Sequence, residues 1–381
     1  MRVALNGWFF IRHPHTGTGQ YLRALLDWLP QVSAEADYHL VIPRVSKTPA
    51  VPAGWRLHPI ACGASDLDKL YFEQVLFPQA CRRLRVDVAH VPYWAPPLFF
   101  SAAPLVVTIH DLIPRLLPPY RGGALARAYT ALVSAATPRA SLILADSEAS
   151  RRDIIDNLRL PEKKVRRIYL AADQRYRPDG NLATEHACRW KYGLPMKYGL
   201  YLGGFDVRKN VPALLEAWAK NHLARHSPLV LAGFVPKPDR RLFADYADLT
   251  ARLGLTSAVK FIGPVDEADK PTLYRGAAVF VYPSRYEGFG LPPLEAMSCG
   301  TPVITTRCAS LPEVVGQAAI MVSPDDPSAL GQAILACLIE PGTAHALRER
   351  GLEQARQFTW QKTARDTAKA YAAAVAVARR I

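Results

Sequence analysis

Short apolar runs alternate along the chain with stretches whose apolar positions recur every three or four residues. The runs indicate buried strands, and the periodic stretches indicate amphipathic helices. Strands are predicted at Arg2–Asn6, Tyr38–Ile42, Val86–Val91, Leu105–Ile109, Leu142–Ala145, Val165–Tyr169, Leu200–Leu202, Leu229–Leu231, Val259–Ile262, Ala278–Tyr282, Val303–Thr305 and Ala319–Val322. Helices are predicted at about 16–30, 66–84, 124–136 and 147–158, and from Trp360 onward. This alternation predicts an α/β protein with doubly wound parallel sheets.

A polar, turn-rich segment at 171–183, AADQRYRPDGNLA, interrupts the alternation and is predicted to be an interdomain linker. The chain has 381 residues, half of them hydrophobic, which is enough for two domains of ordinary size. We therefore expect one doubly wound domain at 1–176 and a second at 184–359. The last helix has apolar residues at 4-3-4 spacing (Ala364, Ala368, Tyr371 and Val375), which permits it to pack against the first domain.

The cysteine pattern and the absence of targeting signals predict a cytoplasmic protein. The six cysteines are scattered without a C-x-x-C pair, which argues against a disulfide framework or a zinc site. Met1 leads directly into the first strand, so no signal peptide is visible. The span Val88–Ile109 has no charged residue and is long enough to cross a bilayer, but four prolines break it. Two strands joined by a loop explain it better.

The chain is basic, with 47 Lys and Arg against 33 Asp and Glu and a net charge of +14. Such an excess favours anionic partners, among them nucleotides, nucleic acids and acidic membranes. No nucleic-acid-binding motif is present, so we expect no nucleic acid. The segment Arg151–Arg177 holds nine basic residues against four acidic ones and predicts a peripheral contact with an anionic membrane. A solvated basic face is the alternative.

The stretch Tyr282–Val303 concentrates the candidate chemistry. Glu287 lies on the loop that follows a predicted strand, Glu295 lies one turn into the next helix, and Gly288 and Gly290 lie between them. In an open α/β sheet, ligands bind at the carboxyl ends of the strands. Glycines let a ligand approach the backbone N–H groups of a helix N-terminus, which favours a polyoxygenated or anionic ligand. Acidic residues that merely complement a helix dipole would explain neither the loop carboxylate nor the glycines.

Three further motifs lie at the ends of predicted strands. Gly17 and Gly19 begin a helix, but the third glycine of a dinucleotide fingerprint is missing, which argues against an NAD-dependent oxidoreductase. His110 directly follows the strand Leu105–Ile109, where such sheets bind ligands. Arg208 and Lys209 precede a helix and form a plausible diphosphate clamp, with a solvated basic turn as the alternative.

Together these motifs resemble the retaining glycosyltransferases of family 4. The resemblance rests on Glu287 and Glu295 within EGFGLPPLEAM, followed by GTPV, and on TIHDLIP around His110. It implies the GT-B fold, in which two Rossmann-like domains face a cleft. The first domain would bind the acceptor, with residues 360–381 crossing back to it, and the second would bind a nucleotide sugar.

The resemblance also assigns roles to individual residues. Those expected to bind the donor are Gly17, Gly19, Gly204, Arg208, Lys209, Val265, Glu287, Gly288, Phe289, Gly290, Leu291 and Glu295. Those expected to take part in catalysis are His110, Glu287, Arg208 and Lys209. The family often has a further basic residue where this chain has Gly204, so it stays open whether Arg208, Lys209 or both meet the phosphates.

The expected reaction is hexosyl transfer with retained anomeric configuration, without a cofactor or a metal ion. The only Asp-x-Asp motif, Asp66-Leu67-Asp68, begins a predicted helix and is interpreted as helix-start acid. The chain is similar to bacterial mannosyltransferases of polysaccharide assembly, which favours GDP-mannose as donor, with UDP-sugars possible, and a glycan or lipid-linked acceptor. The alternatives are a GT-B sugar phosphorylase or synthase and a non-catalytic subunit that binds nucleotide sugars.

Overall fold

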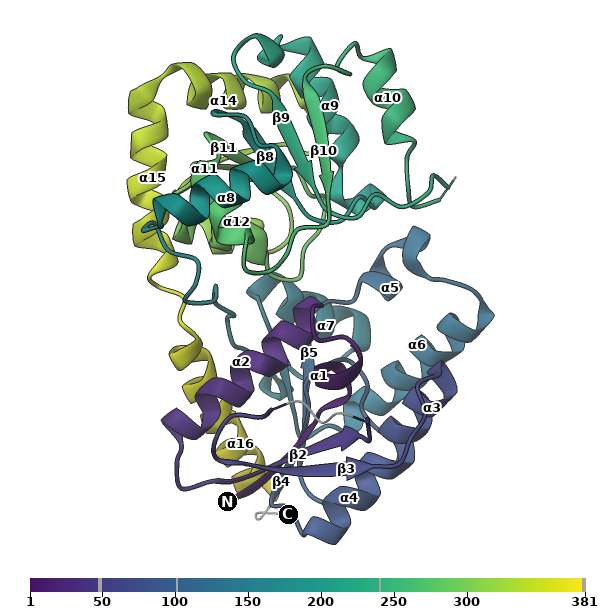
Figure 1. Cartoon of the computed structure of the whole chain (residues 1–381). Helices are drawn as coiled ribbons and strands as arrows, with labels where there is room; N and C mark the ends of the chain where they lie inside the picture. The colour runs from purple at the N-terminus through teal and green to yellow at the C-terminus, as the bar shows by residue number, and fades with distance from the viewer. Residues whose placement is uncertain (47–49, 101, 240, 379–381) are drawn as a thin grey trace. The chain divides into compact units, whose positions relative to one another are not determined.

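The computed structural model describes residues 1–46, 50–100, 102–239 and 241–378. The chain forms two compact units (Figure 1). Unit 1 comprises Met1–Leu170 together with Thr359–Ile381, and unit 2 comprises Ala171–Phe358. Each unit has its own parallel sheet with helices between the strands, as the alternating pattern predicts.

Unit 1 is built on a seven-stranded sheet with the order β3-β2-β1-β4-β5-β6-β7. Its strands are β1 (Arg2–Asn6), β2 (Asp37–Pro43), β3 (Trp55–Ile60), β4 (Val88–Val91), β5 (Leu105–Ile109), β6 (Leu142–Ala145) and β7 (Val165–Arg167). Every residue of β4, β5 and β6 is buried, as expected for central strands whose two faces are both covered. The apolar span Val88–Ile109 therefore consists of two strands and a loop, as predicted.

The helices predicted for unit 1 are present, one of them interrupted. The helices of unit 1 are α1 (Trp8–Arg12), α2 (Gly17–Val32), α3 (Asp66–Tyr71), α4 (Phe77–Leu84), α5 (Ile113–Leu116), α6 (Ala124–Ala136), α7 (Glu148–Leu158) and α16 (Trp360–Ala378), with short turns η2 (Pro118–Tyr120), η3 (Thr137–Arg139) and η4 (Glu162–Lys164). The short helices α1 and α5 were not predicted. A π-helical turn, η1 (Phe72–Leu76), divides the helix predicted at 66–84. It directs the carboxylate of Glu73 into the core, where the Tyr129 hydroxyl donates to it at 2.9 Å.

Unit 2 is built on a six-stranded sheet with the order β10-β9-β8-β11-β12-β13. Its strands are β8 (Gly199–Leu202), β9 (Leu229–Ala232), β10 (Val259–Gly263), β11 (Val279–Tyr282), β12 (Val303–Thr306) and β13 (Ala319–Val322). Its helices are α8 (Leu182–Tyr192), α9 (Val211–Lys220), α10 (Tyr246–Arg252), α11 (Lys270–Gly276), α12 (Leu291–Ser298), α13 (Leu311–Val315), α14 (Pro327–Ile339) and α15 (Pro341–Ala355), with turns η5 (Val207–Lys209) and η6 (Leu223–Arg225).

The elements that the sequence patterns missed include the edge strand β3 and helix α8. The edge strand β3 was not predicted because it has one neighbour, contains a proline and is only partly buried, so it lacks the continuous apolar run of the central strands. Helix α8 begins inside the segment interpreted as linker. Asn181 caps its N-terminus by accepting from the backbone N–H of Ala183, and Gly193 ends it in a left-handed conformation.

The last helix, α16, belongs to unit 1 and packs against α2, β4 and β5. The Tyr371 hydroxyl lies 2.7 Å from Nδ1 of His90, which is a buried residue of β4. The buried stripe of α16 includes Thr363 and Thr367 as well as Ala364 and Tyr371 from the predicted set. The threonine hydroxyls bond to backbone carbonyls, which removes the cost of burying them. None of the described helices is long and apolar enough to cross a membrane.

Candidate functional site

The candidate site of unit 2 lies at the carboxyl edge of its sheet. Because the strands are parallel, the residues that follow β8, β10 and β11 lie at the same edge. Glu287 lies on the loop after β11, and Glu295 lies one turn into α12, as predicted. Arg208 and Lys209 lie on η5 after β8, and Val265 follows β10 and is half-buried.

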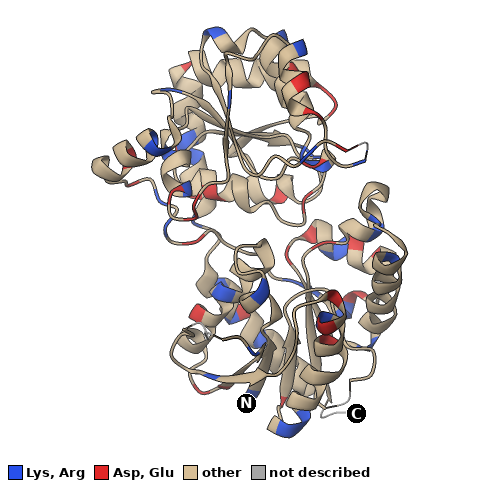
Figure 2. Cartoon of the chain, turned by 45° about the vertical axis from the view of Figure 1, so that its right-hand side comes forward, with Lys and Arg blue, Asp and Glu red and all other residues tan. Residues whose placement is uncertain are grey.

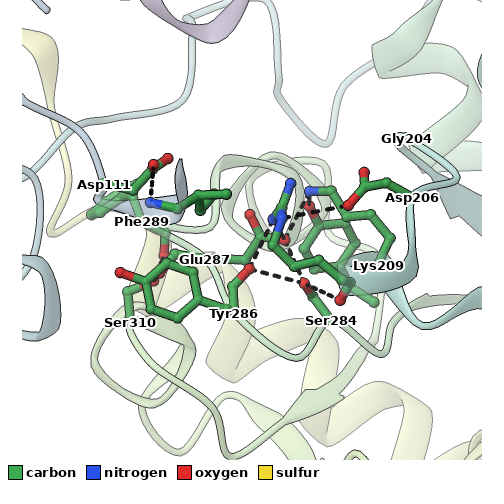
Figure 3. A network of polar contacts seen from close by, with 12 residues as sticks. Asp111, Gly204, Asp206, Lys209, Ser284, Tyr286, Glu287, Phe289 and Ser310 are labelled. Atoms are coloured by element: carbon green, nitrogen blue, oxygen red, sulfur yellow. Dashed lines mark hydrogen bonds and ion pairs between the residues drawn. The ribbon is translucent and has the colours of Figure 1, made fainter. Parts of the chain in front are cut away.

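Glu287 is the centre of a compact polar network (Figure 3). Its Oε1 accepts from Lys209 Nζ at 2.7 Å and from Ser284 Oγ at 2.6 Å, and it lies 2.8 Å from Arg208 Nη1. These three donors all converge on one oxygen. The Tyr282 hydroxyl is also hydrogen-bonded to this carboxylate, whose side chain is 11% exposed. The carboxylate is therefore held firmly at the carboxyl edge of the sheet.

The charges of this network fix its protonation. Burial disfavours the charged carboxylate, but Lys209 and Arg208 more than offset this effect and lower the pKa of Glu287 to about 2. Burial also lowers the pKa of Lys209, against the opposing effect of Glu287. Glu287 is consequently ionised at neutral pH and serves as a hydrogen-bond acceptor, not as a proton donor.

The two cations were predicted to clamp a diphosphate, with a solvated basic turn as the alternative. In the structure both pair with Glu287, Lys209 being buried and Arg208 12% exposed. Lys209 also donates to the Tyr282 hydroxyl and lies over the Tyr282 ring, 4.9 Å from its centroid. Arg208 Nη1 donates to the Tyr286 carbonyl at 2.8 Å, and its Nε lies 3.6 Å from Asp206. Sequence reasoning missed this pairing because Glu287 lies 78 residues beyond Lys209 in the chain.

Hydroxyl groups that sequence reasoning did not single out hold the Glu287 loop in place. Ser310 Oγ lies 2.9 Å from the Glu287 carbonyl and 2.6 Å from the Phe289 carbonyl. Thr305 Oγ1 donates to the Tyr282 carbonyl at 2.8 Å, and Thr306 Oγ1 donates to the Ser284 carbonyl. A run of small hydroxyl residues at the end of β12 was the available signal, because such residues bond to nearby backbone.

The remaining donor-binding candidates differ in how far they are buried. Phe289 is buried and packs edge-on against Phe358, with ring centroids 5.9 Å apart, so a ligand would meet its backbone. Gly288 and Gly290 are buried, and Leu291, the first residue of α12, is half-buried. Gly204 is exposed, and its carbonyl accepts from the Tyr201 hydroxyl.

Glu295 lies in a different environment from Glu287. It is buried, and the Tyr274 hydroxyl donates to its Oε2 at 2.9 Å. Burial raises its pKa, with Lys270 providing a smaller opposing effect. The two glutamates that share one sequence motif thus differ in chemistry: cations lower the pKa of Glu287, whereas burial raises the pKa of Glu295.

Unit 1 contributes a second group of candidates around His110. Its Nδ1 lies 2.6 Å from Oδ2 of Asp146, the buried residue directly after β6, which sequence reasoning missed. Burial disfavours the charged imidazole, but Asp146 outweighs burial and raises the pKa of His110. Its Nε2 is buried and has no hydrogen-bond partner among the described residues. Nδ1 is therefore fixed, and Nε2 remains available.

The glycine motif lies close to His110 through helix α2. Tyr21 on α2 meets the His110 ring edge-on, with centroids 5.0 Å apart. Thr16 caps α2 by accepting from the Gly19 N–H at 3.2 Å. A side chain at Gly19 would lie 2.3 Å from the His13 carbonyl oxygen, so glycine is required there for space. A side chain at Gly17 would contact nothing within 4 Å, which leaves its backbone open to a ligand.

The Asp-x-Asp motif is structural. Ser65 and Asp68 form a capping box at the start of α3, so the motif is helix-start acid, as predicted. In the described parts of the chain, no three His, Cys, Asp or Glu side chains are grouped so as to hold a metal ion. Metal independence of the reaction stays a prediction.

Comparison with known proteins identifies the family. The sequence profile of glycosyltransferase family 4 matches residues 15–175, and that of the glycosyl transferases group 1 matches residues 197–340. The O-antigen chain mannosyltransferase B of Escherichia coli is 31% identical over 389 residues, covering 95% of this chain and 97% of that protein. The chain belongs to glycosyltransferase family 4.

The serotype-specific mannosyltransferase WbdA of Escherichia coli is 32% identical to this family 4 member over 68% of the chain. The matched region spans 32% of WbdA, about a third of that longer protein. Among solved structures, sucrose-phosphate synthase from Thermosynechococcus elongatus superposes with a TM-score of 0.75 at 22% identity, covering 99% of this chain and 100% of that one. WaaG, a glycosyltransferase involved in lipopolysaccharide biosynthesis, superposes with a TM-score of 0.71 at 17% identity, covering 97% of this chain and 99% of that one. The fold is GT-B, as the resemblance implied.

Proposed function

We propose that this glycosyltransferase moves a hexose, with mannose favoured, from a nucleotide diphosphate sugar to a glycan or lipid-linked acceptor in polysaccharide assembly. The transfer retains the anomeric configuration and needs no metal ion. Two relatives that are named mannosyltransferases support the sugar, and one of them, named for the O-antigen chain, supports the pathway. HepE from Anabaena was solved with UDP and glucose, so UDP-sugars are tested alongside GDP-mannose.

The observation that carries the proposal is the anchoring of Glu287 as an ionised carboxylate. A sugar offers hydroxyl donors, and an ionised carboxylate is a strong acceptor for them. Lys209 and Arg208 prevent the carboxylate from picking up a proton as the sugar binds. The carboxylate of Glu287 then fixes the hydroxyls of the donor sugar at the carboxyl edge of the unit 2 sheet.

The same two cations act on the leaving group. In the proposed reaction the acceptor oxygen bonds to the anomeric carbon on the face from which the phosphate departs. The bond from the anomeric carbon to the phosphate oxygen breaks, and the acceptor proton passes to the departing diphosphate. Negative charge grows on that diphosphate, and Arg208 and Lys209 stabilise it. Nε2 of His110 on unit 1 contacts the donor sugar.

Purified protein is expected to form product from one nucleotide sugar of a panel, with the same turnover before and after EDTA treatment. The anomeric configuration of the product, read by NMR, is expected to match that of the donor. Parallel reactions without acceptor and with inorganic phosphate test for hydrolysis and phosphorolysis. Loss of turnover in EDTA, or an inverted anomer, would refute the proposed mechanism, and nucleotide-sugar binding without product would indicate a non-catalytic subunit.

A second experiment tests Glu295, which we propose to accept from the ribose hydroxyls of the nucleotide. Glu295→Gln is expected to weaken binding of the nucleoside diphosphate about tenfold, with little change in kcat. Because burial raises the pKa of Glu295, wild-type affinity should fall as the pH drops through that raised pKa, and the variant should lose this dependence. Calorimetric titration measures both effects.

The control for Glu295→Gln is Glu267→Gln, which removes a nearby carboxylate that pairs with Lys270. This variant should bind nucleotide as the wild type does. If the two variants behave alike, Glu295 is not a ribose ligand.

The lipid-linked form of the acceptor places the reaction at the inner face of the membrane, where the cytoplasmic enzyme would make a peripheral contact. The basic segment Arg151–Arg177 is the proposed contact. Some of its cations are partly neutralised, since Arg151 lies 2.9 Å from Glu148 and Arg175 lies 3.0 Å from Asp173. Sedimentation with neutral and anionic vesicles tests this segment: R152Q/K163Q/R166Q should lose binding to the anionic vesicles, and equal recovery of the wild type with both kinds of vesicle would show that the segment is a solvated basic face.

A further inference from the structure

Unit 1 has a basic pocket that no part of the proposed reaction uses. It encloses about 430 Å³, and the residues that line it include Arg115, Arg121, Arg127, Pro114, Thr130 and Asn157. We call it the arginine pocket. Basic and acidic positions are otherwise interspersed over both units (Figure 2). None of the residues that line the arginine pocket is acidic.

Local structure brings the three arginines together from separate elements. Arg115 lies on α5, which begins three residues after His110, and Arg121 directly follows η2. Gly122 then adopts a φ of 65°, and the chain turns into α6. Arg127 and Thr130 are three residues apart on α6 and therefore share one face of the helix. The pocket is thus assembled by a turn and three helices, since Asn157 comes from α7.

The three arginines have no counter-charge. Among the described residues none of them forms an ion pair. The three arginines are exposed, and like charges that line one pocket repel one another. An anion that enters reduces this repulsion.

In a second pocket on the same unit, acidic side chains neutralise the basic ones. It encloses about 420 Å³, and its lining includes Arg151, Lys163, Arg166 and Arg167 but also Glu148 and Glu162. Arg151 pairs with both glutamates, and Arg167 lies 4.0 Å from Glu148. The two pockets have nearly the same volume, so the difference between them is one of charge.

We propose that the arginine pocket binds a phosphate-bearing group, either a phosphodiester or a diphosphate. The guanidinium is planar and presents paired N–H donors that match two oxygens of a phosphate, and it stays charged at any pH the protein experiences. Thr130 and Asn157 add polar side chains to the lining. All of these residues belong to unit 1, whereas Arg208 and Lys209 belong to unit 2.

The test compares R115Q/R121Q/R127Q with R82Q/R83Q/R365Q, an exposed triple change that removes the same charge from the same unit and lies outside the basic segment Arg151–Arg177. Inorganic diphosphate is titrated by calorimetry with both sets in an R208Q/K209Q background, which removes the unit 2 contacts. Sedimentation with vesicles of phosphatidylcholine, with and without phosphatidylglycerol, is measured for the two sets in the otherwise wild-type chain. Circular dichroism verifies that every variant is folded.

The arginine-pocket variant is expected to bind at least about tenfold more weakly than the control in one of the two measurements. If only the arginine-pocket variant loses diphosphate binding, the proposed site is supported and its ligand is a small phosphate or a phosphate carried by the acceptor. Selective loss of phosphatidylglycerol-dependent sedimentation supports it with a lipid headgroup as ligand. Equal losses in both triple variants would show a general charge effect, and no loss in either would show no site; both results overturn the proposal. Neither measurement depends on sugar transfer, so the outcome is independent of the proposed function.

Discussion

Replacing Glu287 with glutamine is expected to lower the rate of sugar transfer by about 10²-fold or more. The change removes the anion to which Arg208, Lys209 and Ser284 all bond and leaves the two cations without this counter-charge. It also replaces the acceptor oxygen offered to the sugar by a group that no longer carries charge. Loss of one hydrogen bond to the transition state is typically worth about 3 kcal/mol, or roughly 10²-fold in rate. The measurement is kcat at saturating donor.

Ser284→Ala is the matched control for this prediction. It removes one of the three donors to Oε1 but leaves the charge and both cations in place. Its kcat should therefore lie between those of the wild type and Glu287→Gln. Thermal unfolding of each variant separates a catalytic loss from a loss of folded protein, because a variant that is folded at the assay temperature and inactive has lost chemistry. Wild-type kinetics for Glu287→Gln would show that Glu287 is not part of the active site.

His110→Ala is expected to reduce transfer about 10²-fold while leaving the affinity for free nucleoside diphosphate nearly unchanged. The histidine belongs to unit 1, whereas the residues proposed to bind the nucleotide, Glu295 and Arg208 among them, belong to unit 2. Its Nε2 is the atom without a partner and is proposed to donate to the sugar. Calorimetry gives the nucleotide affinity, and the transfer assay gives kcat.

Asp146→Asn provides a graded version of the same test. Asp146 raises the pKa of His110, so the imidazolium persists to higher pH than it would in water. If transfer uses the charged imidazole, activity falls as the pH rises through that raised pKa. In Asp146→Asn the fall should move to lower pH, whereas a purely structural role would lower activity equally at every pH. Full transfer activity in His110→Ala would show that the histidine is structural.

Much of the fold could be predicted from the sequence because it depends on local patterns. The strands Arg2–Asn6, Leu105–Ile109 and Leu142–Ala145 and the helix at 124–136 have the predicted ends. Buried parallel strands must be apolar on both faces, and amphipathic helices must repeat with their own period, so each element is readable from its own residues. The strand β3 was missed because an edge strand obeys neither rule strictly.

The π-helical turn at Phe72–Leu76 was missed for a different reason. Its residues are compatible with an ordinary helix. The feature that accompanies the extra residue in the turn is the buried position of the Glu73 side chain. That carboxylate meets the hydroxyl of Tyr129, which lies 56 residues away in the chain. No pattern within the helix contains this information.

For the candidate site, the sequence by itself determined where the functional groups lie relative to the strands and helices. The prolines predicted that a helix begins between Glu287 and Glu295, and the apolar run before His110 predicted that it follows a buried strand. Both are local signals. The tertiary structure decided which groups meet. The pairing of Glu287 with Lys209 joins residues 78 positions apart, and that of His110 with Asp146 joins residues 36 positions apart. The order of strands in each sheet makes these contacts. Charge and burial together lower the pKa of Glu287 and raise that of Glu295, a difference that a shared motif cannot show.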